Sequence, residues 1–294
     1  MSFRVTVRCS RAQGEAVAST EPFAGSDDPP VLVADERDPS KPDEWVIHAY
    51  FDHHPDAGEI ATLIGLGSGP PEVEKLGEQD WVTMSQAGLQ PIRAGRFTVH
   101  TPTYPPQPDR INFEIDAGLA FGTGQHATTA GCLEALDRLE RDGARFRNIA
   151  DIGTGTGLLA FAALALWPQA KCIATDIDPV AVEVSRENAA INGVTLGHGA
   201  GELLLAAIDG MDSPLLSARA PFDLIIANIL AGPLIELAPG FASALAPGGT
   251  VILAGLLGSQ ADLVVAAYEL RGLALQNRGS GEWPVLVLRR ASTA

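Results

Sequence analysis

The chain has 294 residues, of which 46% are hydrophobic, and a formal net charge of −16. Its length suits one large or two ordinary domains. The negative charge argues against binding along a nucleic-acid backbone, which requires cationic surface. It favours a basic partner, with acidity that only aids solubility as the alternative. No apolar run reaches the ~18 residues of a membrane span, the N-terminus lacks a signal peptide's apolar block, and the three cysteines have no metal-binding spacing. We expect a cytoplasmic protein without a metal.

The first part of the chain, residues 1–81, predicts a small α+β domain. Its pattern indicates strands at 3–9, 31–34, 45–51 and 72–81 and helices at 12–20 and 56–66. This β-α-β-β-α-β order is that of the ferredoxin-like unit. Residues 82–110 are expected to form a linker, because the proline-rich segment 101–108 is unsuited to regular structure.

The remainder of the chain, residues 111–294, alternates strand and helix patterns. Strands are expected at 147–152, 171–177, 222–229, 249–255, 271–277 and 284–290, with a weaker one at 194–198. Helices are expected at 158–167, 179–192 and 231–245. This alternation predicts a mostly parallel sheet with helices on both faces. Ligands of such sheets bind outside the carboxyl ends of the strands.

A glycine-rich turn follows the strand that ends near Asp151. Gly153, Gly155 and Gly157 let the backbone approach a ligand, and Asp176 at the end of the next strand can accept hydrogen bonds from ribose hydroxyls. The third glycine comes one residue too early for the NAD pattern. The carboxylate at Asp151 also disfavours a pyrophosphate and suits a cationic ligand. We therefore predict S-adenosyl-L-methionine as the cofactor, bound by the three glycines and Asp176.

Asn228 ends another predicted strand, and its amide can accept a hydrogen bond from a reacting amine. Methyltransferases of planar amide or nucleobase nitrogens have Pro-Pro-aromatic after this position, whereas this chain has Ile229-Leu230-Ala231. We therefore expect an aliphatic amine substrate, with Asn228 as the catalytic candidate. The alternative is that Asn228 ends the strand and caps the following helix.

The segment 120–129 contains two glycines and three threonines, and is expected to be a loop that closes over the cofactor. Thr128 or Thr129 suits a helix N-cap. His126 is a candidate base, although a lone loop histidine is more often structural or solvated. His53 and His54 lack further metal ligands in the sequence, which favours a solvated turn there.

These motifs together resemble the bacterial PrmA-type methyltransferases, which modify the eleventh protein of the large ribosomal subunit. The resemblance is carried by Phe121-Gly122-Thr123-Gly124-x-His126-x-Thr128-Thr129, Asp151-x-Gly153-x-Gly155-x-Gly157, Asp176-Ile177-Asp178-Pro179 and Asn228-Ile229-Leu230-Ala231. It is strong from about Asp116 to Gly255. Gln125 and Ala127 depart from the family's usual threonine and proline, which leaves the substrate range more open than the cofactor.

The resemblance implies a ferredoxin-like substrate-recognition domain, a linker and a Rossmann-like methyltransferase domain. It further implies methylation of lysine ε-amines and of the N-terminal α-amine of the ribosomal protein, either free or on the ribosome. Thr129, Gly153, Asp176 and Asn228 are then expected to contact the cofactor. We expect a monomer that neither binds a membrane nor reads nucleic acid directly. The alternatives are a lysine methyltransferase of another protein, such as the electron-transfer flavoprotein β-subunit, a small-molecule or RNA methyltransferase, and a non-catalytic module that binds the cofactor.

Overall fold

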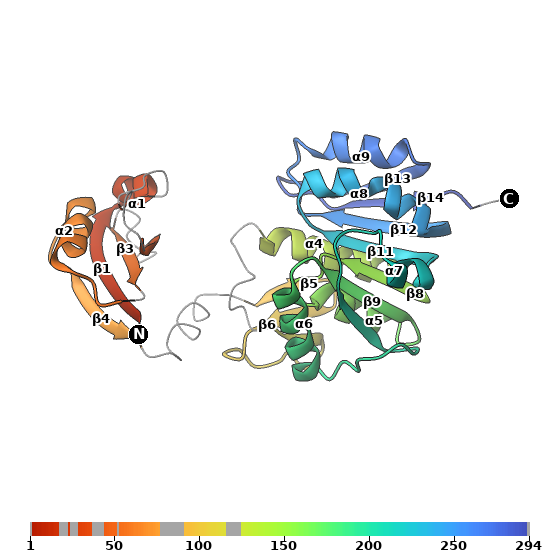
Figure 1. The fold of residues 1–294 in the computed structure, drawn as a ribbon, viewed down its shortest axis with the longest axis horizontal. Helices are drawn as coiled ribbons and strands as arrows, with labels where there is room; N and C mark the ends of the chain where they lie inside the picture. Colours follow the sequence, from red (N-terminus) through yellow and green to blue (C-terminus); the bar gives the residue numbers. More distant parts are fainter. Residues whose placement is uncertain are drawn as a thin grey trace. The chain divides into compact units, whose positions relative to one another are not determined.

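The computed structural model of the protein describes residues 2–17, 23, 29–36, 44–51, 53–76, 91–115 and 125–292. The chain divides into two compact units, Met1–Gly88 and Leu89–Ala294, whose elements are labelled in Figure 1. Across the described ranges, no helix is both long and apolar enough to cross a membrane. Each of the two units has a hydrophobic core of its own.

The first unit is a four-stranded antiparallel sheet with two helices. Its elements are β1 (Ser2–Ser10), α1 (Arg11–Val17), β2 (Val31–Glu36), β3 (Glu44–Phe51), α2 (Ala57–Leu66) and β4 (Glu72–Leu76). The strand order is β2-β3-β1-β4. Val5 and Val7 of β1 and Ala49 of β3 are buried with Leu63 of α2, because alternate residues of a strand face the same side. The predicted ferredoxin-like topology is confirmed.

Helix α2 begins with a complete capping box. The Asp56 side chain accepts hydrogen bonds from the backbone N–H groups of Gly58 and Glu59 at 2.7 and 2.9 Å, and the Glu59 side chain accepts one from the Asp56 N–H at 2.8 Å. This arrangement satisfies N–H groups that have no partner within a helix's first turn. It explains why the helix starts where the sequence predicts.

The second unit is built on a seven-stranded sheet of order β10-β9-β8-β11-β12-β14-β13. Its strands are β8 (Asn148–Ile152), β9 (Lys171–Asp176), β10 (Leu203–Ala207), β11 (Phe222–Asn228), β12 (Leu245–Ala254), β13 (Leu273–Arg278) and β14 (Leu286–Arg290). The first five strands in the sheet order are parallel, and β14 pairs antiparallel with both β12 and β13. This is the predicted α/β architecture with a mostly parallel sheet.

Helices cover both faces of this sheet (Figure 1). They are α4 (Gln125–Arg141), α5 (Leu158–Leu166), α6 (Pro179–Ile191), α7 (Pro214–Arg219), α8 (Ala231–Ala244) and α9 (Ala261–Glu269). Successive strand residues enter opposite cores: Ile226 packs with α4 and α5, whereas Ile225 and Ala227 pack with α7, α8 and α9. Burial on both faces explains the continuous apolar strands of the sequence.

A separate three-stranded sheet belongs to the second unit and corrects the expected linker. It consists of β5 (Ile92–Ala94), β6 (Phe97–His100) and β7 (Ile111–Glu114). Phe97 and Phe113 stack with ring centroids 6.1 Å apart, and both belong to the core shared with α4 and α5. Residues 92–100 are therefore part of the second unit, whereas the proline-rich stretch 101–110 after them has no helix or strand, as expected.

The prediction of a weak strand at 194–198 is wrong. Only Leu196 of that segment forms an isolated bridge, to Leu203, and the edge strand is β10. Its sequence, Leu-Leu-Leu-Ala-Ala, consists of strong helix formers, but pairing with β9 in the sheet overrides that preference.

Candidate active site

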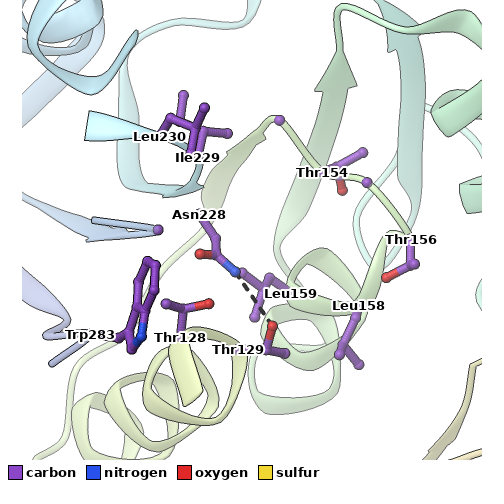
Figure 2. Close-up of a pocket in the computed structure, with 13 residues that line it drawn as sticks. Thr128, Thr129, Thr154, Thr156, Leu158, Leu159, Asn228, Ile229, Leu230 and Trp283 are labelled. Carbon is purple, nitrogen blue, oxygen red and sulfur yellow. Dashed lines mark hydrogen bonds between the residues drawn. The ribbon is translucent and has the colours of Figure 1, made fainter. Parts of the chain in front are cut away.

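A cavity of about 470 Å³ opens where parallel strands end. Gly153 follows β8, Asn228 ends β11 and Gly255 follows β12, so three neighbouring strands contribute to it. Figure 2 shows it bounded by α4 on one side and by the glycine turn on the other. Its lining residues are Thr128, Thr129, Gly153, Thr154, Gly155, Thr156, Leu158, Leu159, Asn228, Ile229, Leu230, Gly255 and Trp283. The cavity thus lies where the sheet topology predicts a ligand site.

The glycine turn supplies backbone groups to this cavity. Gly153 has φ +73°, and a Cβ there would collide with Ile229. Gly155 has φ +56°, but a Cβ there would meet no atom within 4 Å, so this residue faces open space. Gly157, with φ +86°, is the N-cap of α5 and does not line the cavity. Gly153 therefore lets the turn pack against Ile229, Gly155 leaves space for a ligand, and Gly157 permits the start of the helix.

Asp151 lies beneath the turn and holds its shape. Its Oδ2 accepts hydrogen bonds from Thr154 Oγ1 at 2.7 Å and from the Ala160 N–H at 3.2 Å. Its Oδ1 is buried and has no partner among the described residues. Burial raises the pKa of this carboxyl to about 7; the nearby Asp176 charge adds to the increase, and the two hydrogen bonds oppose it. A cationic ligand would favour the ionised form of such a group.

Asp176 braces the same turn from the neighbouring strand. Its Oδ2 accepts a hydrogen bond from the Gly155 N–H at 2.9 Å, and its Oδ1 accepts one from the Asp178 N–H at 3.1 Å. Each carboxylate oxygen can accept a further hydrogen bond. Asp176 does not itself line the cavity, and its contact with a ribose remains a prediction.

Helix α6 holds the turn from its other side, a feature that the sequence analysis missed. Ser185 Oγ donates a hydrogen bond to the Gly155 carbonyl at 2.7 Å, and Asn188 Nδ2 donates one to the Thr156 carbonyl at 3.0 Å. Both side chains are buried. Their spacing of three residues, which places them on one face of a helix, was the available signal.

Asn228 lies between the strands and α4. Its Nδ2 is 3.5 Å from Thr129 Oγ1, a long contact that Figure 2 draws as a dashed line. It does not cap the following helix, because the N-cap of α8 is Leu230 and no side chain caps it. Thr128 and Thr129 lie inside α4, which begins at Gln125, so neither is its N-cap. Both nevertheless reach the cavity.

Two loops are relevant to the site: the one expected to close over the cofactor and the one between β13 and β14. Residues 116–124, which include the first half of the expected closing loop, lie outside the described part of the chain, as does the side chain of His126. Trp283, in the loop between β13 and β14, lines the cavity but was not predicted. A single tryptophan in a loop has no periodic pattern from which to infer its position.

The site suits the predicted cofactor in size and chemistry. The cavity falls within the roughly 300–1,000 Å³ of small-molecule sites, and its walls combine apolar side chains with hydroxyl, amide and backbone groups. In its ionised form, the Asp151 carboxylate, whose Oδ1 has no partner among the described residues, would place negative charge beneath the turn. Within the described ranges, no cluster of three histidine, cysteine or acidic side chains could hold a metal ion.

Comparison with known proteins gives a consistent result. The family model described as "Ribosomal protein L11 methyltransferase (PrmA)" matches residues 6–291. A ribosomal protein L11 methyltransferase of Brucella suis is 48% identical over 225 residues, which cover 75% of this chain and 76% of that protein. Another, from Rhizobium etli, is 42% identical over 275 residues, which cover 90% of each. The resemblance inferred from the motifs is thereby confirmed.

A solved structure supports the same fold. The crystal structure of a ribosomal protein L11 methylase from Lactobacillus delbrueckii subsp. bulgaricus matches with a TM-score of 0.57 and 29% identity. The match covers 69% of this chain and 98% of that one. The predicted Rossmann-like methyltransferase fold is confirmed.

Proposed function

Because the chain belongs to the ribosomal protein L11 methyltransferase (PrmA) family, we propose that it methylates that ribosomal protein. The chain is a methyltransferase, and its cofactor is S-adenosyl-L-methionine. The proposed acceptors are lysine ε-amines and the N-terminal α-amine. The single observation that carries the choice of acceptor is the sequence Asn228-Ile229-Leu230, which lacks the proline and aromatic residues that hold a planar nitrogen.

The cofactor residues are assigned by their positions at the cavity. Gly153 and Gly155 line the cavity, and Gly155 faces open space. Gly157 is the N-cap of α5, and Asp176 has acceptor capacity for ribose hydroxyls beside the turn. Thr129 lies on the opposite wall, in α4, where its hydroxyl can reach a polar group of the ligand. When bound, S-adenosyl-L-methionine supplies an electrophilic methyl group on a positively charged sulfur. Asp151 lies near enough to the turn to favour that charge.

The protein's own contribution to the reaction is chiefly to orient and desolvate the amine. None of the described residues that line the cavity has an acidic, basic or histidine side chain. At pH 7, deprotonating a lysine with a pKa of ~10.4 costs roughly 4–5 kcal/mol, whereas deprotonating an α-amine with a pKa near 8 costs about 1.4 kcal/mol. Burial favours the neutral amine, and orientation alone can contribute ~7–11 kcal/mol. Asn228 holds the amine through its amide oxygen.

Recognition of the ribosomal protein is assigned to the ferredoxin-like unit, and catalysis to the larger unit. The net charge of −16 suits a basic partner. We place the reaction in the cytoplasm, with the enzyme as a monomer and the ribosomal protein either free or assembled in the ribosome.

A transfer assay with blocked substrates tests the proposed acceptors. The purified chain is incubated with methyl-labelled S-adenosyl-L-methionine and unmethylated ribosomal protein L11, either intact, acetylated only at its N-terminus, or acetylated at all amines. We expect full labelling of the intact protein, partial labelling after N-terminal acetylation, and none after complete acetylation. Label that survives complete acetylation would contradict methylation of amines.

A further inference from the structure

The indole of Trp283 forms one end of the cavity. Figure 2 shows it beside Thr128 and on the Asn228 side, whereas Thr154 and Thr156 of the glycine turn lie on the opposite side. Leu230, two residues after Asn228, also lines the cavity and is 72% exposed. Trp283 and Leu230 thus bring apolar surface to the Asn228 end of the site.

The backbone around Trp283 is held in place by its neighbours. The Glu282 carbonyl accepts a hydrogen bond from the Gly258 N–H at 2.8 Å, and the Val285 carbonyl accepts one from the Gly279 N–H at 2.8 Å. Gly131 of α4 lies so close to Val285 that an added Cβ would come within 2.6 Å of its Cγ2 atom. The loop is therefore fixed both to the segment after β12 and to α4, on either side of the tryptophan.

The order of strands indicates whether Trp283 lies on the cofactor side or on the substrate side of the site. Along the sheet, Asp176 ends β9, the glycine turn follows β8, Asn228 ends β11, and β12 and β14 come next. With a ribose at Asp176 and the reacting amine at Asn228, the cofactor occupies the β9 and β8 side. The amine-bearing chain then approaches from the β12 and β14 side, where Trp283 lies.

We propose that Trp283 is a specificity-determining residue that packs against the aliphatic chain carrying the amine. The inference rests on the proposed function and extends it to a named contact. A flat indole offers a large apolar surface at little cost in conformational entropy, and its face attracts a methylated, positively charged nitrogen. The site is thereby selective for an extended aliphatic amine, and it retains that amine between successive methyl transfers.

Kinetics of Trp283→Ala and Trp283→Phe test this role. We expect the alanine variant to raise the KM for a lysine-containing L11 peptide about tenfold, and the phenylalanine variant to restore most of the loss. The Kd for S-adenosyl-L-methionine should be unchanged in both. Glu282→Ala, which alters the exposed neighbouring side chain, is the matched control and should behave as wild type. The proposal would be overturned if Trp283→Ala left the peptide KM unchanged, or if it raised the Kd for the cofactor instead of the KM for the peptide.

Methyl transfer by the wild-type enzyme tests the proposed function separately from the role of Trp283. If it transfers no methyl group to ribosomal protein L11, that proposal fails, and the role of Trp283 is tested without turnover. In that case the complex with S-adenosylhomocysteine is titrated with n-butylamine, which has the side chain of lysine. A fluorescence change in wild type that is absent from Trp283→Phe supports the contact, and identical titrations of the two proteins overturn it.

Discussion

Replacing Asp151 by asparagine should remove a large pH dependence of stability from the cofactor-free protein. The folded protein raises the pKa of this buried carboxyl from 3.8 to about 7. Between these values the folded state holds a proton that the unfolded state releases. The stability that this proton contributes is therefore fully present below pH 4 and is lost as the pH rises through 7.

The expected magnitude follows from this interval. It spans roughly three pH units, each worth about 1.4 kcal/mol, so the full contribution is on the order of 4 kcal/mol. About 3 kcal/mol of this should be lost between pH 5 and pH 8. An asparagine can still accept the hydrogen bonds from Thr154 and Ala160 that Asp151 accepts, but it does not titrate. The variant should therefore lack this part of the pH dependence.

Urea denaturation of wild type and Asp151→Asn at pH 5 and pH 8 measures the effect. The drop in free energy of unfolding should be smaller in the variant by about 3 kcal/mol. Asp142→Asn, which changes an exposed acid at the end of α4, is the control and should follow wild type. Equal drops in wild type and Asp151→Asn would refute the reasoning.

Three other substitutions separate the roles assigned around the cavity. Asn228→Ala should lower kcat about 10- to 100-fold at saturating cofactor and peptide, because the amine loses its oriented acceptor; an unchanged kcat would contradict that role. Asp176→Ala should raise the cofactor Kd about 10- to 100-fold by calorimetry, and an unaltered Kd would exclude the ribose contact. Ser185→Ala removes the hydrogen bond to the Gly155 carbonyl and should raise the cofactor Kd about fivefold. Exposed Glu183→Ala on the same helix serves as its control, and identical affinities for these two variants would exclude positioning by Ser185.

The fold was largely predictable because its strongest signals are local. Asp56 and Glu59 mark the start of α2, and Pro179 occupies the first turn of α6, where its missing N–H costs nothing. The edge strand β10 could not be predicted in the same way, because its leucine and alanine residues favour a helix until β9 pairs with them. The short strands β5 and β6 obtain their stability from packing on α4, which local sequence does not reveal.

The site residues likewise comprise some that local sequence predicts and others that depend on tertiary packing. The glycines, Asp176 and Asn228 lie at strand ends, so alternation of strands and helices was sufficient to bring them to one edge of the sheet. Ser185 and Trp283 act through contacts with residues distant in sequence, Gly155 and the cavity respectively. Such contacts depend on how α6 and the loop before β14 pack, which no motif records.

Intact-protein mass spectrometry of ribosomal proteins tests the central claim most directly. Ribosomal proteins from a strain that lacks this enzyme are compared before and after incubation with the purified chain and S-adenosyl-L-methionine. The account predicts mass increases in multiples of one methyl group on the eleventh large-subunit protein alone. Cofactor binding with no mass change on that protein would contradict the proposed substrate.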